Sequence, residues 1–137
     1  MIKVLFICKG NIGRSQMARG LFDKLSNFKS EAAGVSSGSN LKLGKYPGTE
    51  NVIVCMKEED IDVSEREIKQ ITPRMVEEAE IIIALTKEVP DFVSRSNKVQ
   101  FWNIDNPKGY DLNNTRKTRD EIKTKVEILI ESLKGKK

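Results

Sequence analysis

Histidine is absent from this chain of 137 residues, and cysteine occurs only twice. Catalytic sites that pair a cysteine or a serine with a histidine are therefore excluded, as are the usual histidine-ligated zinc sites. Two cysteines are also too few for a structural zinc site with four thiolate ligands. Any enzymatic chemistry must come from a cysteine, from carboxylates, lysines, arginines or hydroxyls, or from a borrowed cofactor.

The sequence also lacks a long apolar run. No stretch approaches the ~18 consecutive apolar residues that a membrane-spanning helix requires, and the N-terminus does not have the pattern of a secretory signal peptide. We therefore expect a soluble, cytoplasmic protein without a membrane partner. A reducing compartment would keep a reactive cysteine unpaired, and the sequence leaves open whether Cys8 and Cys55 form a disulfide.

Aromatic residues are few, at 6%, whereas charged residues make up 32% and leave a net charge of +4. Basic residues gather at Lys42, Lys45 and the C-terminal tail, but carboxylates are mixed with basic residues elsewhere. This pattern favours a solvated surface over a nucleic-acid interface, so we expect no nucleic-acid partner. The mild positive charge could steer an anionic substrate toward a site.

The length fits one domain, residues 1–137, with a sizeable core. Short apolar runs alternate with amphipathic segments along it. Strands are expected at Lys3–Cys8, Lys29–Ala33, Ile81–Leu85 and Val99–Asn103. Strands that alternate with helices imply an α/β fold, in which helices cover both faces of a four-stranded parallel sheet.

Apolar stripes predict the helices between these strands. Another helix is expected from Pro73 to Glu78, and Gly135 should end the last one. Residues 36–48, rich in serine, glycine and lysine, are predicted to form a loop. The stripes are Ala18, Leu21, Phe22 and Leu25 in the first helix, and Ile122, Val126, Leu129, Ile130 and Leu133 in the last.

The most informative segment is CKGNIGRS, which runs from Cys8 to Ser15 between the first predicted strand and the first predicted helix. The backbone N–H groups of such a loop, together with the helix N-terminus, can converge on one oxyanion. Gly10 and Gly13 permit positive φ angles and close backbone approach, and Arg14 can hold two phosphate oxygens. The positive potential favours the thiolate form of Cys8, which then needs no histidine to act as a nucleophile.

The remaining loop residues complete a predicted phosphate site that spans Lys9 to Ser15, Ile12 included. Asn11 can brace the loop by bonding to loop carbonyls, and Ser15 is placed to donate to the cysteine sulfur. A lone cysteine before a glycine-containing turn is more often a small buried hydrophobe. An arginine and a hydroxyl residue at this spacing from the cysteine make the combination specific.

With these residues the chain resembles the low-molecular-weight protein tyrosine phosphatase family, which also contains the thioredoxin-coupled arsenate reductases. In that family the loop cysteine attacks phosphorus to give a cysteinyl-phosphate, which water hydrolyses. The resemblance implies this activity with no metal or organic cofactor, and it assigns the apolar segment 52–56 to a helix. It covers essentially the whole chain and includes Gln16-Met17-Ala18, Ala32-Ala33-Gly34, residues 61–64, residues 81–85 and Trp102 through Pro107.

The loop after the fourth predicted strand should supply a general acid. Ligands of such sheets lie beyond the carboxyl ends of the strands, so this loop is expected beside the cysteine. The family's acid is the aspartate directly before a proline, whereas this chain has Asn106 before Pro107. We predict Asp105 as the acid and Asp111 as a weaker candidate. Without an acid, the protein would cleave only substrates with good leaving groups or merely bind phosphate.

Residues around this loop bear on the substrate. Tyr110 and Tyr46 could stack on a phenyl phosphate, although a surface or core tyrosine is the commoner reading of each. Lys108 favours a more anionic substrate. We therefore expect a phosphorylated protein or small molecule, or inorganic phosphate or a similar oxyanion, as the binding partner.

Two other functions remain open. The thioredoxin-coupled reductases use two further cysteines, at positions where this chain has Gly13 and Thr86, so arsenate reduction would need an external thiol partner. Cys55 falls in a predicted core helix. A module that only binds phosphate or phosphopeptides is the other alternative, but binding alone does not need a thiolate. We predict a cysteine-dependent hydrolase of tyrosine-phosphate-type monoesters, whose activity Asn106 at the family's acid position would reduce.

Overall fold

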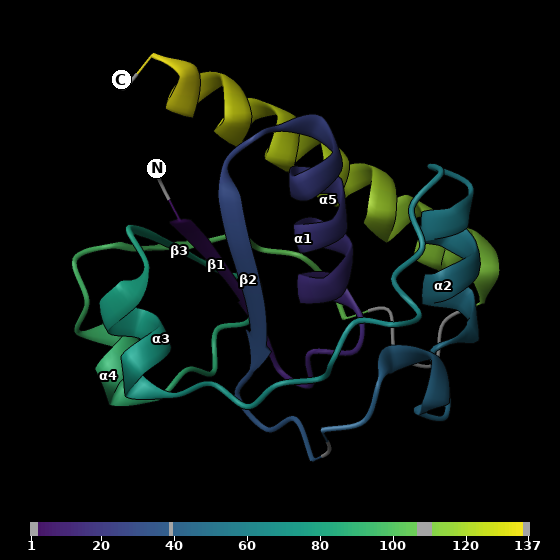
Figure 1. The fold of residues 1–137 in the computed structure, drawn as a ribbon, viewed down its shortest axis with the longest axis horizontal. Helices are drawn as coiled ribbons and strands as arrows, with labels where there is room; N and C mark the ends of the chain where they lie inside the picture. The colour runs from purple at the N-terminus through teal and green to yellow at the C-terminus, as the bar shows by residue number, and fades with distance from the viewer. Residues whose placement is uncertain (1–2, 39, 107–110, 136–137) are drawn as a thin grey trace.

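A computed structural model describes residues 3–38, 40–106 and 111–135 (Figure 1). Its four strands form one parallel sheet in the order β2-β1-β3-β4, which confirms the predicted α/β fold class. The strands are β1 (Lys3–Cys8), β2 (Lys29–Gly34), β3 (Ile81–Ala84) and β4 (Val99–Phe101). The helices are α1 (Arg14–Leu25), α2 (Glu50–Lys57), α3 (Pro73–Glu78), α4 (Asp91–Ser94), α5 (Leu112–Lys134) and the 3-10 helix η1 (Leu43–Lys45).

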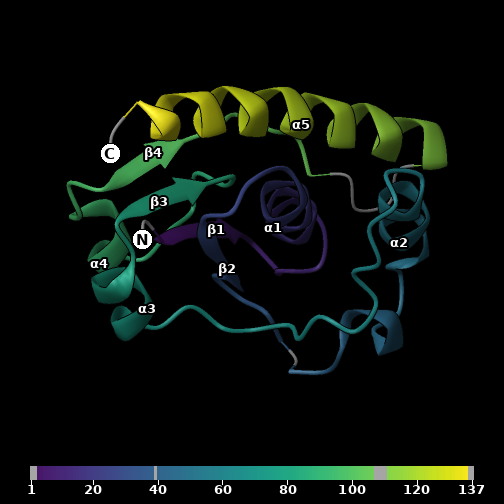
Figure 2. The ribbon, with the colours of Figure 1, turned by 45° about the horizontal axis from the view of Figure 1, so that its top comes forward.

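Helices cover both faces of the sheet, with α1 and α5 on one face and α3 and α4 on the other (Figure 2). Neighbouring residues of a strand point to opposite faces, so Phe6 of β1 packs toward α1 while Leu5 and Ile7 pack toward α3 and α4. The rings of Phe6 and Phe22 meet edge to face, with centroids 5.5 Å apart. Because it is buried on both faces, β1 is apolar almost throughout.

The strand register brings the carboxyl ends together at one edge. Cys8 at the end of β1 is the partner of Gly34 at the end of β2, and Ile7 is the partner of Ala84 in β3. The chain passes from β1 to β2 on one side and then crosses back to β3 on the other side of β1, so the sheet switches its order beside β1. This is the place where ligands bind in open parallel sheets.

Most predicted elements are confirmed, and the helix that family likeness placed at residues 52–56 is α2. The helix α4 and the turn η1 were not predicted, because elements of four and three residues are too short to carry a helical repeat. Leu25 is a correction to the predicted stripe of α1, since it lies at the helix end and is 40% exposed. The predicted stripe of α5 is buried throughout.

The strand boundaries also differ slightly from those predicted. β3 ends at Ala84 and β4 at Phe101, both earlier than expected, and β2 continues to Gly34. Within the described part of the chain, no helix has the length and apolar character needed to cross a bilayer.

Candidate active site

Cys8 is the last residue of β1, and two polar groups lie at its sulfur. The backbone N–H of Asn11 donates to Sγ at 3.2 Å, and the hydroxyl of Ser15 lies 2.9 Å from Sγ. Ser15 Oγ also donates to Asn11 Oδ1 at 2.7 Å. A hydroxyl has a single proton, so Ser15 donates either to Asn11 or to the sulfur. If Cys8 is a thiolate, the Ser15 hydroxyl would direct its hydrogen bond to the sulfur.

Asn11 has the left-handed backbone conformation that the sequence analysis expected at Gly10 and Gly13. Its φ is 59°, and neither of those two glycines has a positive φ. Asparagine tolerates this conformation better than most residues. Its side chain is fully buried and accepts from Ser15, whereas we had predicted bonds to loop carbonyls; Nδ2 has no partner among the described residues.

Gln16 fixes the same loop by donating a hydrogen bond to one of its backbone carbonyls. Its Nε2 donates to the backbone carbonyl of Asn11 at 3.0 Å and to that of Glu67 at 3.3 Å. The loop is thereby linked to a segment more than 50 residues away in the sequence. In the sequence Gln16 belonged only to the family resemblance, and no role was predicted for it.

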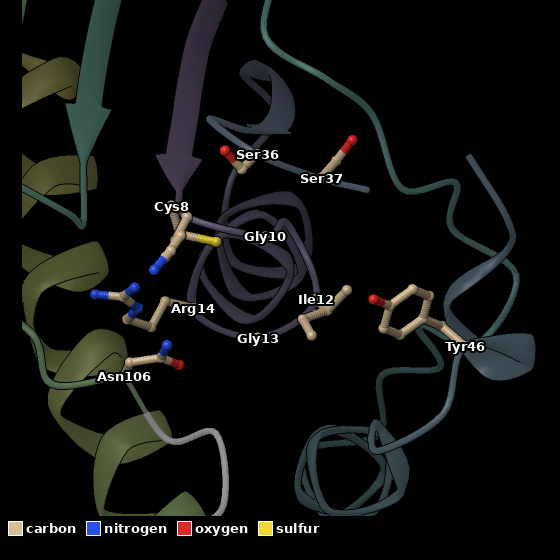
Figure 3. A pocket seen from close by; sticks show the side chains of 10 residues that line it. Cys8, Gly10, Ile12, Gly13, Arg14, Ser36, Ser37, Tyr46 and Asn106 are labelled. Carbon is tan, nitrogen blue, oxygen red and sulfur yellow. The ribbon is translucent and has the colours of Figure 1, made fainter. Parts of the chain in front are cut away.

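Arg14 is the first residue of α1, and its side chain is tethered to the far side of the site. Nη1 donates to the carbonyl of Leu85, after β3, and to that of Ile104, after β4, the latter at 2.9 Å. Both bonds use Nη1, so they do not occupy Nε and Nη2. Figure 3 places Arg14 between Cys8 and Asn106. Among the described residues no side chain caps the N-terminus of α1, so its N–H groups can receive an anion.

The end of β2 supports the loop from beneath, which the sequence analysis did not foresee. A Cβ at Gly34 would lie 2.8 Å from the carbonyl carbon of Gly10 and 2.9 Å from the nitrogen of Asn11, so only glycine fits there. Past β2, the N–H of Ser36 donates to the carbonyl of Lys9 at 2.7 Å. A glycine at the end of a strand was the only signal in the sequence.

These elements enclose one pocket (Figure 3). Asn11 and Ser15, both buried, lie beneath it rather than in its wall. Asn106 is at the wall, but Asp105 is exposed and does not line the pocket. Pro107, Lys108 and Tyr110 lie outside the described residues. The wall is formed by Cys8, Lys9, Gly10, Ile12, Gly13, Arg14, Ser36, Ser37, Tyr46 and Asn106.

A cysteine followed by an anion-binding loop and a tethered arginine is the arrangement expected from the family resemblance. The family model described as "Low molecular weight phosphotyrosine protein phosphatase" matches residues 3–137. The chain belongs to this family. An arsenate reductase (Arsenate reductase 2) of Staphylococcus epidermidis is 31% identical over 127 residues, which cover 90% of this chain and 92% of that protein.

Solved structures of this family have the same fold. The low molecular weight protein tyrosine phosphatase from T. tengcongensis is 23% identical, with a TM-score of 0.81 over 96% of this chain and 99% of that chain. An arsenate reductase in the phosphate binding state is 28% identical, with a TM-score of 0.80 over 96% and 98%. The family therefore includes cysteine-dependent phosphatases and arsenate reductases.

The family's further reductase cysteines have no counterpart in this site. Thr86 lies in a second hollow, which it lines together with Arg14 and Trp102. Cys55 is buried in α2, does not line the pocket and forms no disulfide with Cys8. Burial raises the pKa of the Cys55 thiol, and its carbonyl accepts from Arg119 Nη1 at 2.9 Å. This environment is that of an inert core thiol.

Proposed function

We propose that this protein hydrolyses phosphate monoesters of the tyrosine-phosphate type through a cysteinyl-phosphate intermediate. The observation that carries the proposal is the surroundings of Cys8, whose sulfur meets the N–H of Asn11 at 3.2 Å and the hydroxyl of Ser15 at 2.9 Å at the pocket wall. Donors aimed at a sulfur stabilise its thiolate, which is the nucleophilic form.

In the first step the Cys8 thiolate attacks phosphorus, and the bond from phosphorus to the ester oxygen breaks. The loop N–H groups and Arg14 hold the three equatorial oxygens as the phosphorus becomes trigonal bipyramidal. The leaving phenolate takes its electron pair with it and needs a proton. In the second step water attacks phosphorus and the thiolate leaves, with the Ser15 hydroxyl stabilising the sulfur.

Asp105 is the proposed proton donor, and its position makes it an imperfect one. It lies between Ile104, whose carbonyl is held by Arg14, and Asn106, which lines the pocket. Asp105 is exposed and does not line the pocket. Its side chain must therefore turn inward to protonate a leaving group, so esters of acidic phenols should react best.

Steady-state hydrolysis of p-nitrophenyl phosphate and of a phosphotyrosine peptide, without added metal, tests this function. We expect turnover of both substrates and its loss in Cys8→Ser. The variant Cys55→Ser is the matched control, because it removes the chain's other thiol and should leave turnover near the wild-type level. Asp105→Asn should slow the peptide more than p-nitrophenyl phosphate, since its phenol is the poorer leaving group. Absence of hydrolysis in the wild type, with phosphate still bound, would overturn the proposal.

Arsenate reduction is the second candidate, favoured by the 31% identity to a staphylococcal arsenate reductase. Reduction of arsenate to arsenite takes two electrons, which two thiols supply as they form a disulfide. The pocket provides one thiol, so an external thiol would have to provide the other. Arsenite production from arsenate with added glutathione, lost in Cys8→Ser, would support this activity.

A further inference from the structure

The wall of the pocket has two chemically different sides. Tyr46 directs its ring toward Ile12, and these two side chains make an apolar side (Figure 3). Ser36 and Ser37 lie apart from them, above Cys8 in Figure 3. The N–H of Ser36 donates to the carbonyl of Lys9, which joins the backbone of Lys9 to this polar side.

Positive charge dominates the wall. Among the described residues that line the pocket, two are cations and none is a carboxylate. The two cations differ in their surroundings. Arg14 is 7% exposed and tethered through Nη1 to two backbone carbonyls, whereas the side chain of Lys9 is exposed. Arg14 is therefore held where it can bind a phosphate, whereas the exposed side chain of Lys9 is accessible to another group of a bound substrate.

Lys9 also differs from those lysines of the chain that form ion pairs. Several lysines pair with a carboxylate within 4.0 Å, but no carboxylate in residues 3–38, 40–106 and 111–135 lies within that distance of Lys9. Its backbone is nevertheless held in place, because Ser36 N–H donates to its carbonyl at 2.7 Å and Val35 N–H donates to that of Cys8 at 3.0 Å. An unpaired charge on a fixed backbone suits an external anion.

We propose that Lys9 makes this site selective for phosphotyrosine peptides that have an aspartate or glutamate next to the phosphorylated residue. The inference rests on the proposed function. The phosphotyrosine ring lies against Tyr46 and Ile12, and the neighbouring carboxylate lies toward Lys9 and Ser36. Recognition of this kind needs a peptide substrate, since p-nitrophenyl phosphate has no second anionic group.

The test uses two phosphotyrosine peptides that differ only in having glutamate or glutamine beside the phosphotyrosine. At low salt the wild type should prefer the acidic peptide by about three- to fivefold in kcat/KM, the range of an exposed ion pair. Lys9→Met should abolish the preference, and Lys9→Glu should reverse it. The matched control is Lys29→Met, which removes the same charge at the amino end of β2, at the opposite edge of the sheet, and should keep the preference.

Two results would overturn the inference. One is a wild type that cleaves both peptides equally. The other is an equal loss for both peptides in Lys9→Met, which would mean that Lys9 serves the phosphate itself. The affinities of both peptides for the Cys8→Ser variant, measured by calorimetry, give the same comparison without turnover. Absence of hydrolysis would overturn the phosphatase proposal, whereas equal binding of the two peptides would overturn the selectivity proposal.

Discussion

The proposed phosphate loop, residues 8–15, and the proposed acid loop, of which Asp105 and Asn106 are described, lie at one pocket but are held very differently. In the phosphate loop, residues 8–15, Asn11 and Ser15 are fully buried and joined by hydrogen bonds to each other and to Cys8. In the acid loop, Asp105 and Asn106 are both exposed. In the proposed mechanism the nucleophile and the anion site are therefore preorganised, whereas proton transfer depends on a side chain that must move.

This difference separates two kinds of catalytic effect. Preorganised donors stabilise the transition state without a cost of reorganisation at the moment of reaction. A proton donor that reaches the leaving group in only part of its conformations contributes less than a fixed one. Changes to the phosphate loop should thus affect every substrate, while changes to the acid loop should discriminate between leaving groups.

Gly34→Ala should distort the ordered phosphate loop and have the largest effect. Its Cβ would lie 2.8 Å from the Gly10 carbonyl carbon, so the phosphate loop must shift. We expect kcat/KM to fall on the order of 100-fold for all substrates and stability to fall by about 1–3 kcal/mol. Kinetics and urea unfolding measure these effects.

Gly135→Ala is the control for that substitution, because a Cβ there has its nearest contact at 3.8 Å. It should leave both kinetics and stability near the wild type. Wild-type turnover in Gly34→Ala would mean that the end of β2 does not position the phosphate loop.

Asn106→Asp should strengthen acid catalysis, because it places a carboxyl group at the pocket wall. We expect kcat for the phosphotyrosine peptide to rise about 10- to 100-fold, with a much smaller change for p-nitrophenyl phosphate, because acid catalysis matters most for poor leaving groups. Steady-state rates across pH measure it. Asn97→Asp makes the same change in an exposed residue before β4 and should raise neither rate; a gain there as large as in Asn106→Asp would point to net charge rather than acid catalysis.

Gln16→Ala should have a smaller effect on the phosphate loop. It removes the donor to the Asn11 carbonyl, and losing such a buried partner costs about 1–3 kcal/mol of stability. We expect a severalfold fall in kcat for both substrates alike. Gln16→Met keeps much of the volume without the donor and should behave like Gln16→Ala; if it restored activity, packing rather than hydrogen bonding would explain the effect.

Glu58→Gln should have the smallest effect, and it acts on the helix that follows the acid loop. Hydrogen bonds from Arg116 and Arg119 of α5 lower the pKa of Glu58 from 4.5 to about 2. The carboxylate therefore adds stability that is fully present above its unfolded pKa and is lost as pH falls from about 4.5 through about 2.

The variant should melt slightly below the wild type at pH 7, and the difference should shrink as the pH falls through that range and as salt screens the pair. Thermal unfolding followed by circular dichroism measures it. Glu121→Gln, an exposed change in α5, should give no such pH-dependent difference. A difference for Glu58→Gln that is as large at pH 2 as at pH 7 would contradict the assignment.

Much of the fold was predictable because it depends on local patterns. The uniformly apolar β1 and the apolar stripe of α5 are each written in a continuous stretch of sequence, and both elements are found where they were predicted. Leu25 was misplaced because a helical stripe does not show where the neighbouring core ends. The short helix α4 has too few residues for any repeat to be recognised.

By itself the sequence determined the parallel α/β fold and the family, because the residues of the phosphate loop are contiguous between one strand and one helix. Tertiary structure alone decided that Asn106 rather than Asp105 lines the pocket, that Gly34 supports the loop, and that Lys9 and Tyr46 lie on its wall. Those relations join segments far apart in the chain. They depend on how the ends of separate strands pack at one edge of the sheet, which no local pattern encodes.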